Sequence, residues 1–180
     1  MRETVEVVLA DAMDQNLLLD AAIATNETQA ENLWLLRDSI APAERALGPA
    51  MQHDISVPVE RMPDFVEAAI PKVEDHFAGT KAIAFGHLGD GNVHFHVLAP
   101  AGSTPGKWEE TQGKNISQVI YEMVTEWGGS ISAEHGIGQV KRDELGRLGD
   151  PVALGLMRSV KAALDPEGIL NPGKLVPNSV

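Results

Sequence analysis

Histidine and acidic side chains gather in two short runs of this chain, and their spacing gives the first indication of chemistry. The run at 86–97 reads GHLGDGNVHFHV, and the run at 132–138 reads SAEHGIG. The first run holds His87, His94 and His96, and the second adds the carboxylate of Glu134 and a fourth imidazole, His135. These groups offer lone pairs to a metal ion and exchange protons near neutral pH. The two runs therefore indicate a metal or proton-transfer site, provided that the fold brings them together.

The turn inside the first run predicts how its histidines are arranged. Asp90-Gly91 is a strong signal for a two-residue hairpin, because a type I′ turn needs positive φ at both central positions. A hairpin centred there pairs His87 with His94, and directly opposed residues have Cβ atoms about 4.5–5.5 Å apart. His96 follows two residues after His94 and so points to the same face. One face of the hairpin is thus expected to carry all three histidines.

The segments around this hairpin have the pattern of an α+β fold. Residues 52–58 alternate polar and apolar side chains like a half-buried strand. Apolar residues at helical spacing follow in 62–77 and again in 116–127, on either side of the hairpin. A last short strand at 130–134 completes the order β-α-β-β-α-β, the ferredoxin-like split pattern. The two helices then cover one face of the sheet and leave the other face open.

The alternation of side chains tests whether both runs share that open face. If Ile55 faces the helices, the polar residues beside it in the first strand face the open side. By the same rule Glu134 lies on the open side if Ile131 faces the helices. Glu134 then joins His87 and His94 in a His₂Glu set, which suits zinc or manganese and leaves a coordination position for substrate. A solvated sheet face that happens to carry histidines is the alternative.

Composition limits the class of protein. The length of 180 residues fits one domain with appendages, which we divide into a helical N-terminal segment (1–50), a ferredoxin-like core (51–135) and a C-terminal part with helices and a tail (136–180). Acidic residues outnumber basic residues 26 to 14, so nucleic acid is a poor partner. The chain has no cysteine, which excludes thiol nucleophiles and disulfides.

The sequence carries no sign of a membrane or secreted protein. No apolar run approaches the roughly 18 residues that span a bilayer, and no signal peptide is recognisable. We therefore expect a cytoplasmic protein without a transmembrane segment. A homo-oligomer stays open at this point.

Three motifs, in the right order along the chain, closely resemble one known family. They are GHLGDGNVHFHV (86–97), SAEHGIGQVKRDEL (132–145) and LDPEGILNPGKL (164–175). The resemblance is to the carboxy-terminal substrate domain of FAD-linked D-2-hydroxy-acid dehydrogenases, and it extends over about residues 3–177. That family includes D-lactate dehydrogenases, the FAD subunit of glycolate oxidase and D-2-hydroxyglutarate dehydrogenase. It implies an oxidoreductase that acts on a small 2-hydroxy acid.

The resemblance also implies a role for individual residues. The family's metal is held by two histidines and a glutamate whose motif positions match His87, His94 and Glu134. The metal would bind the carboxylate and the 2-hydroxyl oxygen of the substrate and lower the pKa of the hydroxyl group. The next residue, His135, would take the hydroxyl proton as a general base. Hydride would then pass from C2 of the substrate to N5 of the flavin.

Further contacts are implied outside the metal set. The family's arginine that clamps a substrate carboxylate from the preceding helix matches Arg37, a role suited to a planar guanidinium. His96 falls in the substrate pocket of the resembled family. The tail resembles the segment that packs against the flavin domain, so Asn171 and Lys174 are candidate FAD contacts. A helix stop and a surface lysine are the alternative interpretation of these two residues.

Three departures from the family pattern bear on the substrate. Many relatives have a lysine where this chain has Gln52, and some carry a threonine at the position of Ala41. Some 2-hydroxyglutarate-type members have an asparagine at the position of His96. These changes remove a cation and a hydroxyl group from the expected distal pocket. We therefore expect a small acid such as D-lactate or glycolate as the substrate, and not a dicarboxylate.

The flavin-binding part of such an enzyme is expected to lie outside this chain. The family binds FAD mainly through an amino-terminal domain, for which this chain has no room, and we find no Gly-rich pyrophosphate loop. We expect a fragment or subunit that works with a flavin-binding domain or subunit, passes electrons to an acceptor that the sequence does not identify, and is inactive alone. A non-catalytic binding or assembly module and a stand-alone metal-dependent hydrolase are the alternatives.

Overall fold

The computed structural model describes residues 2–174, 176 and 177, and it divides the chain into two compact units, Met1–Ala46 and Leu47–Val180. The first unit is helical, as the sequence predicts. Its helices are α1 (Arg2–Asp14), α2 (Glu27–Asp38) and α3 (Ile40–Leu47). Helix α2 begins where the side chain of Asn26 accepts a hydrogen bond of 3.0 Å from the backbone N–H of Gln29, which satisfies one of the free amide groups of the first turn.

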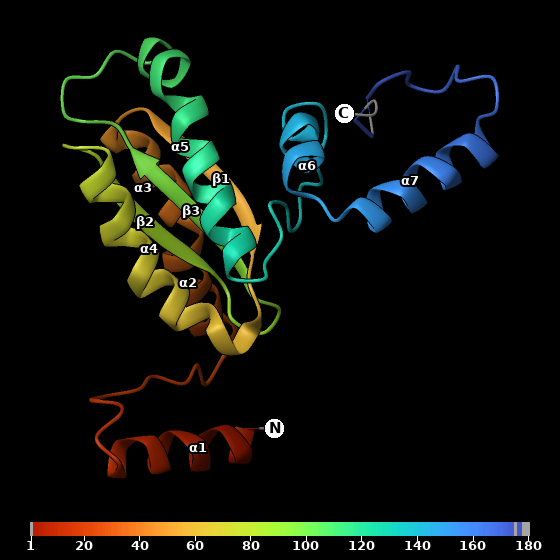
Figure 1. Cartoon of the computed structure of the whole chain (residues 1–180). Helices are drawn as coiled ribbons and strands as arrows, with labels where there is room; N and C mark the ends of the chain where they lie inside the picture. Colours follow the sequence, from red (N-terminus) through yellow and green to blue (C-terminus); the bar gives the residue numbers. More distant parts are fainter. Residues whose placement is uncertain (1, 175, 178–180) are drawn as a thin grey trace. The chain divides into compact units, whose positions relative to one another are not determined.

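The second unit is built on a three-stranded antiparallel sheet. Its strands are β1 (Ala50–Ser56), β2 (Lys81–His87) and β3 (Asn92–Leu98), in the order β1-β3-β2. After a short 3₁₀ turn (Val59–Arg61), helix α4 (Met62–His76) connects β1 to β2, and helix α5 (Lys107–Glu126) follows β3. Figure 1 shows both helices running along the same side of the sheet. The predicted α+β class, with helices on one face, is confirmed.

The core forms where the alternating strand residues meet the apolar stripes of the two helices. Ile55, Val93 and Phe95 are fully buried on the helix-facing side of the sheet, as the alternation predicts. The ring of Phe65 in α4 packs edge-on against Phe95, with ring centroids 6.3 Å apart. Each such buried side chain contributes roughly 1.5–3 kcal/mol relative to its exposed state. The apolar core on the helix side therefore supplies most of the stability of the sheet, and the opposite side can carry polar groups.

The hairpin between β2 and β3 differs from the prediction by two residues. His87 pairs with Asn92 and Phe85 pairs with His94, so residues 88–91 form a four-residue loop instead of a two-residue turn. Within this loop the N–H of Gly91 donates to the carbonyl of His87, over 3.1 Å. A shift of two residues keeps every side chain on its predicted face, because the strand period is two.

The loop gains its shape from contacts beyond the hairpin. The Oδ1 atom of Asp90 accepts a hydrogen bond of 3.0 Å from the backbone N–H of Asn92. Gly91 has φ +76° and lies so close to the chain that an added Cβ atom would stand 2.0 Å from the carbonyl oxygen of Val57. Leu88, which the two-residue turn would place on the core face, is exposed in the loop.

The predicted last strand at 130–134 is wrong. Ser130 forms an isolated bridge with Ser56, and the chain then leaves the sheet. The backbone N–H groups of Glu134 and its neighbours donate to the carboxylate of Asp54, where a strand would have donated to backbone carbonyls. A side chain of β1 therefore replaces the ladder that would have continued the strand.

Two helices follow, as the sequence predicts. Helix α6 (Arg142–Leu148) is short, and helix α7 (Pro151–Leu164) begins with Asp150 accepting a hydrogen bond from the N–H of Ala153, over 2.9 Å. In the tail beyond α7, the Asp165 carboxylate accepts hydrogen bonds from the N–H groups of Ile169 and Leu170. Among the described residues, no helix is long and apolar enough to cross a membrane.

Candidate functional site

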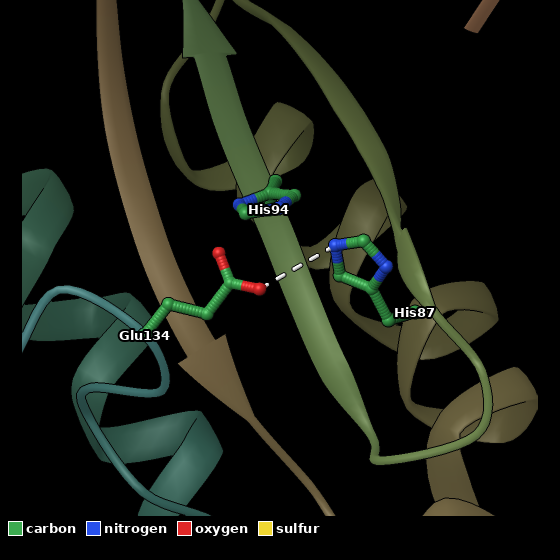
Figure 2. Close-up of side chains that lie close together, drawn as sticks. All are labelled: His87, His94 and Glu134. Carbon is green, nitrogen blue, oxygen red and sulfur yellow. Dashed lines mark ion pairs between the residues drawn. The ribbon is translucent and has the colours of Figure 1, made fainter. Parts of the chain in front are cut away.

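Three side chains from separate parts of the second unit converge on the open side of the sheet. His87 ends β2, His94 lies in β3, and Glu134 lies in the segment after the Ser56–Ser130 bridge. One ligand atom from each of the three lies within 4.8 Å of the other two. Figure 2 shows the rings of His87 and His94 facing the Glu134 carboxylate, with Nε2 of His87 3.5 Å from its Oε1 atom. The predicted meeting of these residues is found.

The surroundings of His94 favour the neutral imidazole that binds metal ions. Its ring lies against Phe85, with centroids 5.2 Å apart, and meets the ring of His87 edge-on at 5.7 Å. Burial lowers the pKa of His94 below its ordinary value of 6.5, and this effect outweighs the opposite influence of Asp54 and Glu134. A lowered pKa leaves a lone pair available at neutral pH.

The Asp54 carboxylate lies directly behind this set and is 4 % exposed. Its Oδ2 atom accepts backbone hydrogen bonds from Ala133 (3.3 Å), Glu134 (2.9 Å) and His135 (2.8 Å). Its Oδ1 atom accepts a hydrogen bond of 2.8 Å from the Asn92 side chain. Burial alone would raise the pKa of Asp54, but the hydrogen bonds from His135 and Asn92 hold it below its ordinary value of 3.8. Asp54 is thus an ionised buried group with both oxygens in use.

His135 lies next to Glu134 with its ring largely in solvent. Its side chain is 72 % exposed, and its Nδ1 atom lies 3.7 Å from Oδ2 of Asp54. A carboxylate beside Nδ1 favours a proton on that nitrogen and leaves the lone pair on Nε2. The ring is therefore accessible to a small molecule, and its predicted role as a general base stays a prediction.

The other predicted site residues are distributed more widely. His96 is buried on the open face of β3, with its ring centroid 6.4 Å from that of His94. Arg37 is exposed in α2 of the first unit, where its guanidinium lies 3.3 Å from the Asp38 carboxylate. In the tail, Lys174 donates a hydrogen bond of 2.8 Å from Nζ to the side chain of Gln139. The remaining tail candidate, Asn171, has a positive φ of 47°.

Sequence reasoning missed the residues that hold the site in place. The alternation put Asp54 on the open face, but nothing in the sequence marked it as the acceptor of three backbone N–H groups. Lys141 was also missed: its Nζ donates to the carbonyls of Ile131 (2.9 Å) and Asp54 (3.1 Å) and so ties the 131–141 segment to β1. Lys141 belongs to no recognisable sequence pattern, so the sequence gives no signal for this contact. Burial lowers the pKa of Lys141, partly offset by Asp54.

The donor chemistry of the convergent set fits a divalent ion. Two imidazole nitrogens and one carboxylate oxygen are the ligands of many catalytic zinc sites, which keep a further position for water or substrate. Manganese accepts the same donor types. His87, His94 and Glu134 are therefore the candidate metal ligands among the described residues.

Comparison with known proteins places this chain in a family. Residues 1–175 match the family described as "FAD linked oxidases, C-terminal domain". The chain is 37% identical over 175 residues to a probable mitochondrial D-2-hydroxyglutarate dehydrogenase of Oryza sativa subsp. indica, covering 97% of this chain and 30% of the relative. It is 38% identical over 165 residues to a D-2-hydroxyglutarate dehydrogenase of Stutzerimonas stutzeri, covering 91% and 35%.

A mammalian relative gives a similar result. The chain is 38% identical over 170 residues to the mitochondrial D-2-hydroxyglutarate dehydrogenase of Rattus norvegicus, covering 94% of this chain and 30% of the relative. The chain thus spans about a third of the length of the curated relatives that it matches. Because the family match extends over nearly the whole sequence and the three sequence motifs lie within it, the chain belongs to the family of C-terminal domains of FAD linked oxidases.

Proposed function

We propose that this chain is the substrate- and metal-binding part of an FAD-dependent dehydrogenase that oxidises a D-2-hydroxy acid to the 2-oxo acid. The observation that carries the proposal is the convergence of His87, His94 and Glu134 within 4.8 Å, in a chain of the FAD linked oxidase family. The complete reaction involves a flavin-binding part, which the family name implies. That part and the electron acceptor are expected partners of this chain.

The residues of the site divide the work of the reaction. His87, His94 and Glu134 would hold zinc or manganese, a Lewis acid that lowers the pKa of a bound hydroxyl group. His135 accepts the hydroxyl proton at Nε2, because Asp54 lies 3.7 Å from Nδ1 and stabilises the imidazolium that forms. FAD, when held by the flavin-binding part, would accept the hydride from C2 of the substrate. Loss of the hydroxyl proton to His135 and of the hydride to the flavin would convert the hydroxy acid to the oxo acid.

Two substrate classes have support, from different observations. D-2-hydroxyglutarate is favoured by the names of the relatives, which share 37–38% of aligned residues with this chain. D-lactate or glycolate is favoured by the chain's own departures from the family pattern. Gln52 and His96 are directly paired across β1 and β3. In the resembled family pattern, many members have a lysine at the first position and some have an asparagine at the second. A pocket without the lysine has less charge with which to bind a second carboxylate.

A substrate comparison on the chain joined to a flavin domain tests the proposal. We expect flavin reduction by a D-2-hydroxy acid and its loss in Glu134→Gln, with His76→Ala, an exposed histidine at the end of α4, as the control. A clearly higher kcat/KM for D-2-hydroxyglutarate than for D-lactate and glycolate would exclude the small-acid proposal, and the reverse order would exclude the dicarboxylate. Reduction by none of the three acids would contradict the enzymatic proposal itself.

The chain by itself provides a second test. With added FAD and an artificial electron acceptor, we expect no turnover of any of the three acids. Turnover above that of Glu134→Gln would contradict the proposal that catalysis needs a separate flavin-binding part. Metal-dependent hydrolysis without flavin would instead favour the stand-alone hydrolase, the main alternative enzyme for a His₂Glu set.

A further inference from the structure

The Asp54 carboxylate joins the two parts of the chain that supply the candidate metal ligands. Asp54 lies on the open face of β1, directly opposite His94 in the β1–β3 ladder. It is buried, and its two oxygens accept hydrogen bonds from two different parts of the chain. Oδ1 is bound from β3 by Asn92, and Oδ2 is bound by the segment that carries Glu134.

On the Oδ2 side, three consecutive backbone N–H groups converge on one atom. Those of Ala133, Glu134 and His135 lie 3.3, 2.9 and 2.8 Å away. Successive N–H groups that point into one concavity form an anion-binding arrangement, and here the anion is a side chain of the same protein. Beyond the bridge at Ser130, no regular strand or helix holds the described residues 131–141. Lys141 ties the start of this segment to β1 through the carbonyls of Ile131 and Asp54, and the three hydrogen bonds to the Asp54 carboxylate hold the part that carries Glu134.

On the Oδ1 side, the carboxylate faces the ring of His94. The distance from Nδ1 of His94 to Oδ1 of Asp54 is 3.9 Å. Asn92 fixes that oxygen with a 2.8 Å hydrogen bond and donates a second one, of 3.0 Å, to the carbonyl of Ile55. Histidines that bind metals commonly have a carboxylate behind the ring, which sets the tautomer and the ring orientation.

We propose that Asp54 is the positioning residue of this site: it presents Glu134 through the backbone of 133–135 and orients the ring of His94, without itself being a metal ligand. The role of Asp54 in metal binding rests on the proposed function of His87, His94 and Glu134. Its role in placing the 133–135 segment is independent of that function. Asp54→Asn is the sharpest test, because it keeps the shape of the side chain and replaces one acceptor oxygen by a donor that faces N–H groups.

Titration with cobalt(II) alone measures the metal-dependent part. We expect Asp54→Asn to weaken Co²⁺ binding about 10- to 100-fold and to shift the visible absorption spectrum of the bound ion toward that of Glu134→Gln. Asp75→Asn is the matched control, because Asp75 is exposed in α4, and it should behave as wild type. A purely structural role would lower stability without changing the spectrum of the bound ion. A folded Asp54→Asn chain with wild-type affinity and spectrum would overturn the proposal.

Amide hydrogen exchange in the metal-free chain separates this inference from the proposed function. The amides of 133–135 should be protected in wild type and should exchange at least about tenfold faster in Asp54→Asn, with α5 unchanged, as expected for a local opening. If wild type binds no Co²⁺, the metal proposal fails and this readout still decides the role of Asp54. If Asp54→Asn does not fold, the wild-type chain alone decides. Protected amides at 133–135 support the positioning role of Asp54, and unprotected amides there overturn it.

Discussion

The Nε2 atom of His87 lies 3.5 Å from the Oε1 atom of Glu134, although the two residues come from a hairpin and a distant segment of the chain. Both side chains are partly exposed, and even a fully charged pair at such a site is worth at most about 1 kcal/mol. Their attraction alone therefore does not hold the two segments together. The backbone does: β2 places His87, and the hydrogen bonds to Asp54 place Glu134. The nitrogen and oxygen donor atoms are therefore already close together before any ligand binds, as a metal ion that accepts both donor types would need.

The metal content of the purified chain should reveal this arrangement directly. We expect about one zinc or manganese ion per chain, as in other sites with three protein ligands, and its loss in the double variant His87→Ala/Glu134→Gln. The control is His76→Ala, which removes an exposed histidine from the end of α4 and should keep the ion. Elemental analysis gives the content, and circular dichroism shows whether each chain is folded. A folded wild-type chain without metal would contradict the prediction.

The stability of the second unit should fall with decreasing pH because of His53. This ring is buried in the core, where Nδ1 lies 3.1 Å from the carbonyl of Phe95 and Nε2 lies 2.9 Å from Oγ of Ser117. Burial lowers the pKa of His53 from 6.5 to about 4. Between these pH values the unfolded chain binds a proton that the folded chain does not, so the free energy of unfolding decreases as the pH falls from 6.5 to 4.

The size of this effect follows from the shift. The lowered pKa of His53 corresponds to about 3 kcal/mol over that pH range, with little dependence on His53 above pH 6.5. Denaturant titrations of wild type and His53→Gln at several pH values measure it, because the variant keeps polar contacts but cannot titrate. Below pH 6.5, the free energy of unfolding of wild type should fall steadily relative to that of His53→Gln. Parallel curves would show that His53 does not contribute the slope.

Substitution of Gly91 should disturb both the hairpin and the site. An alanine there would take a positive φ, which costs about 1–2 kcal/mol, and its Cβ atom would stand 2.0 Å from the carbonyl of Val57. We expect Gly91→Ala to lower the free energy of unfolding by more than about 2 kcal/mol and to weaken metal binding, since His87 ends the adjoining strand. Gly89→Ala is the control, because an added Cβ there meets nothing within 4 Å. Equal stability of the two variants would contradict this prediction.

The family resemblance predicts that Arg37 acts on the substrate and not on the metal. In the chain joined to a flavin domain, we expect Arg37→Ala to lower kcat/KM about 10- to 100-fold, mainly through KM, because a charged hydrogen bond to a carboxylate is worth about 1.5–3 kcal/mol. Arg37→Lys should recover only part of the loss, since a lysine cannot bind a carboxylate in the same bidentate way. Metal content should not change. Arg45→Ala, which alters an exposed arginine in α3, is the control, and an equal effect there would exclude a specific role for Arg37.

The sequence by itself determined which side chains share a face. Alternation along a strand is a local property, so His87, His94 and His96 stay together even though the hairpin register differs from the prediction by two residues. The apolar spacing that predicted α4 and α5 is local in the same way. The family was also accessible from the sequence, because its three motifs are contiguous stretches of residues.

The tertiary structure decided how Glu134 reaches the histidines. The sequence pattern assigned it to a strand, yet it lies in a segment held by the Asp54 carboxylate, a contact between residues far apart in the chain. The hairpin register was decided in the same way, because Gly91 packs against the backbone at Val57 and its carbonyl accepts a hydrogen bond of 3.0 Å from the N–H of Val57. Contacts of this kind depend on hydrogen bonds across the fold, and neither periodicity nor residue type reports them.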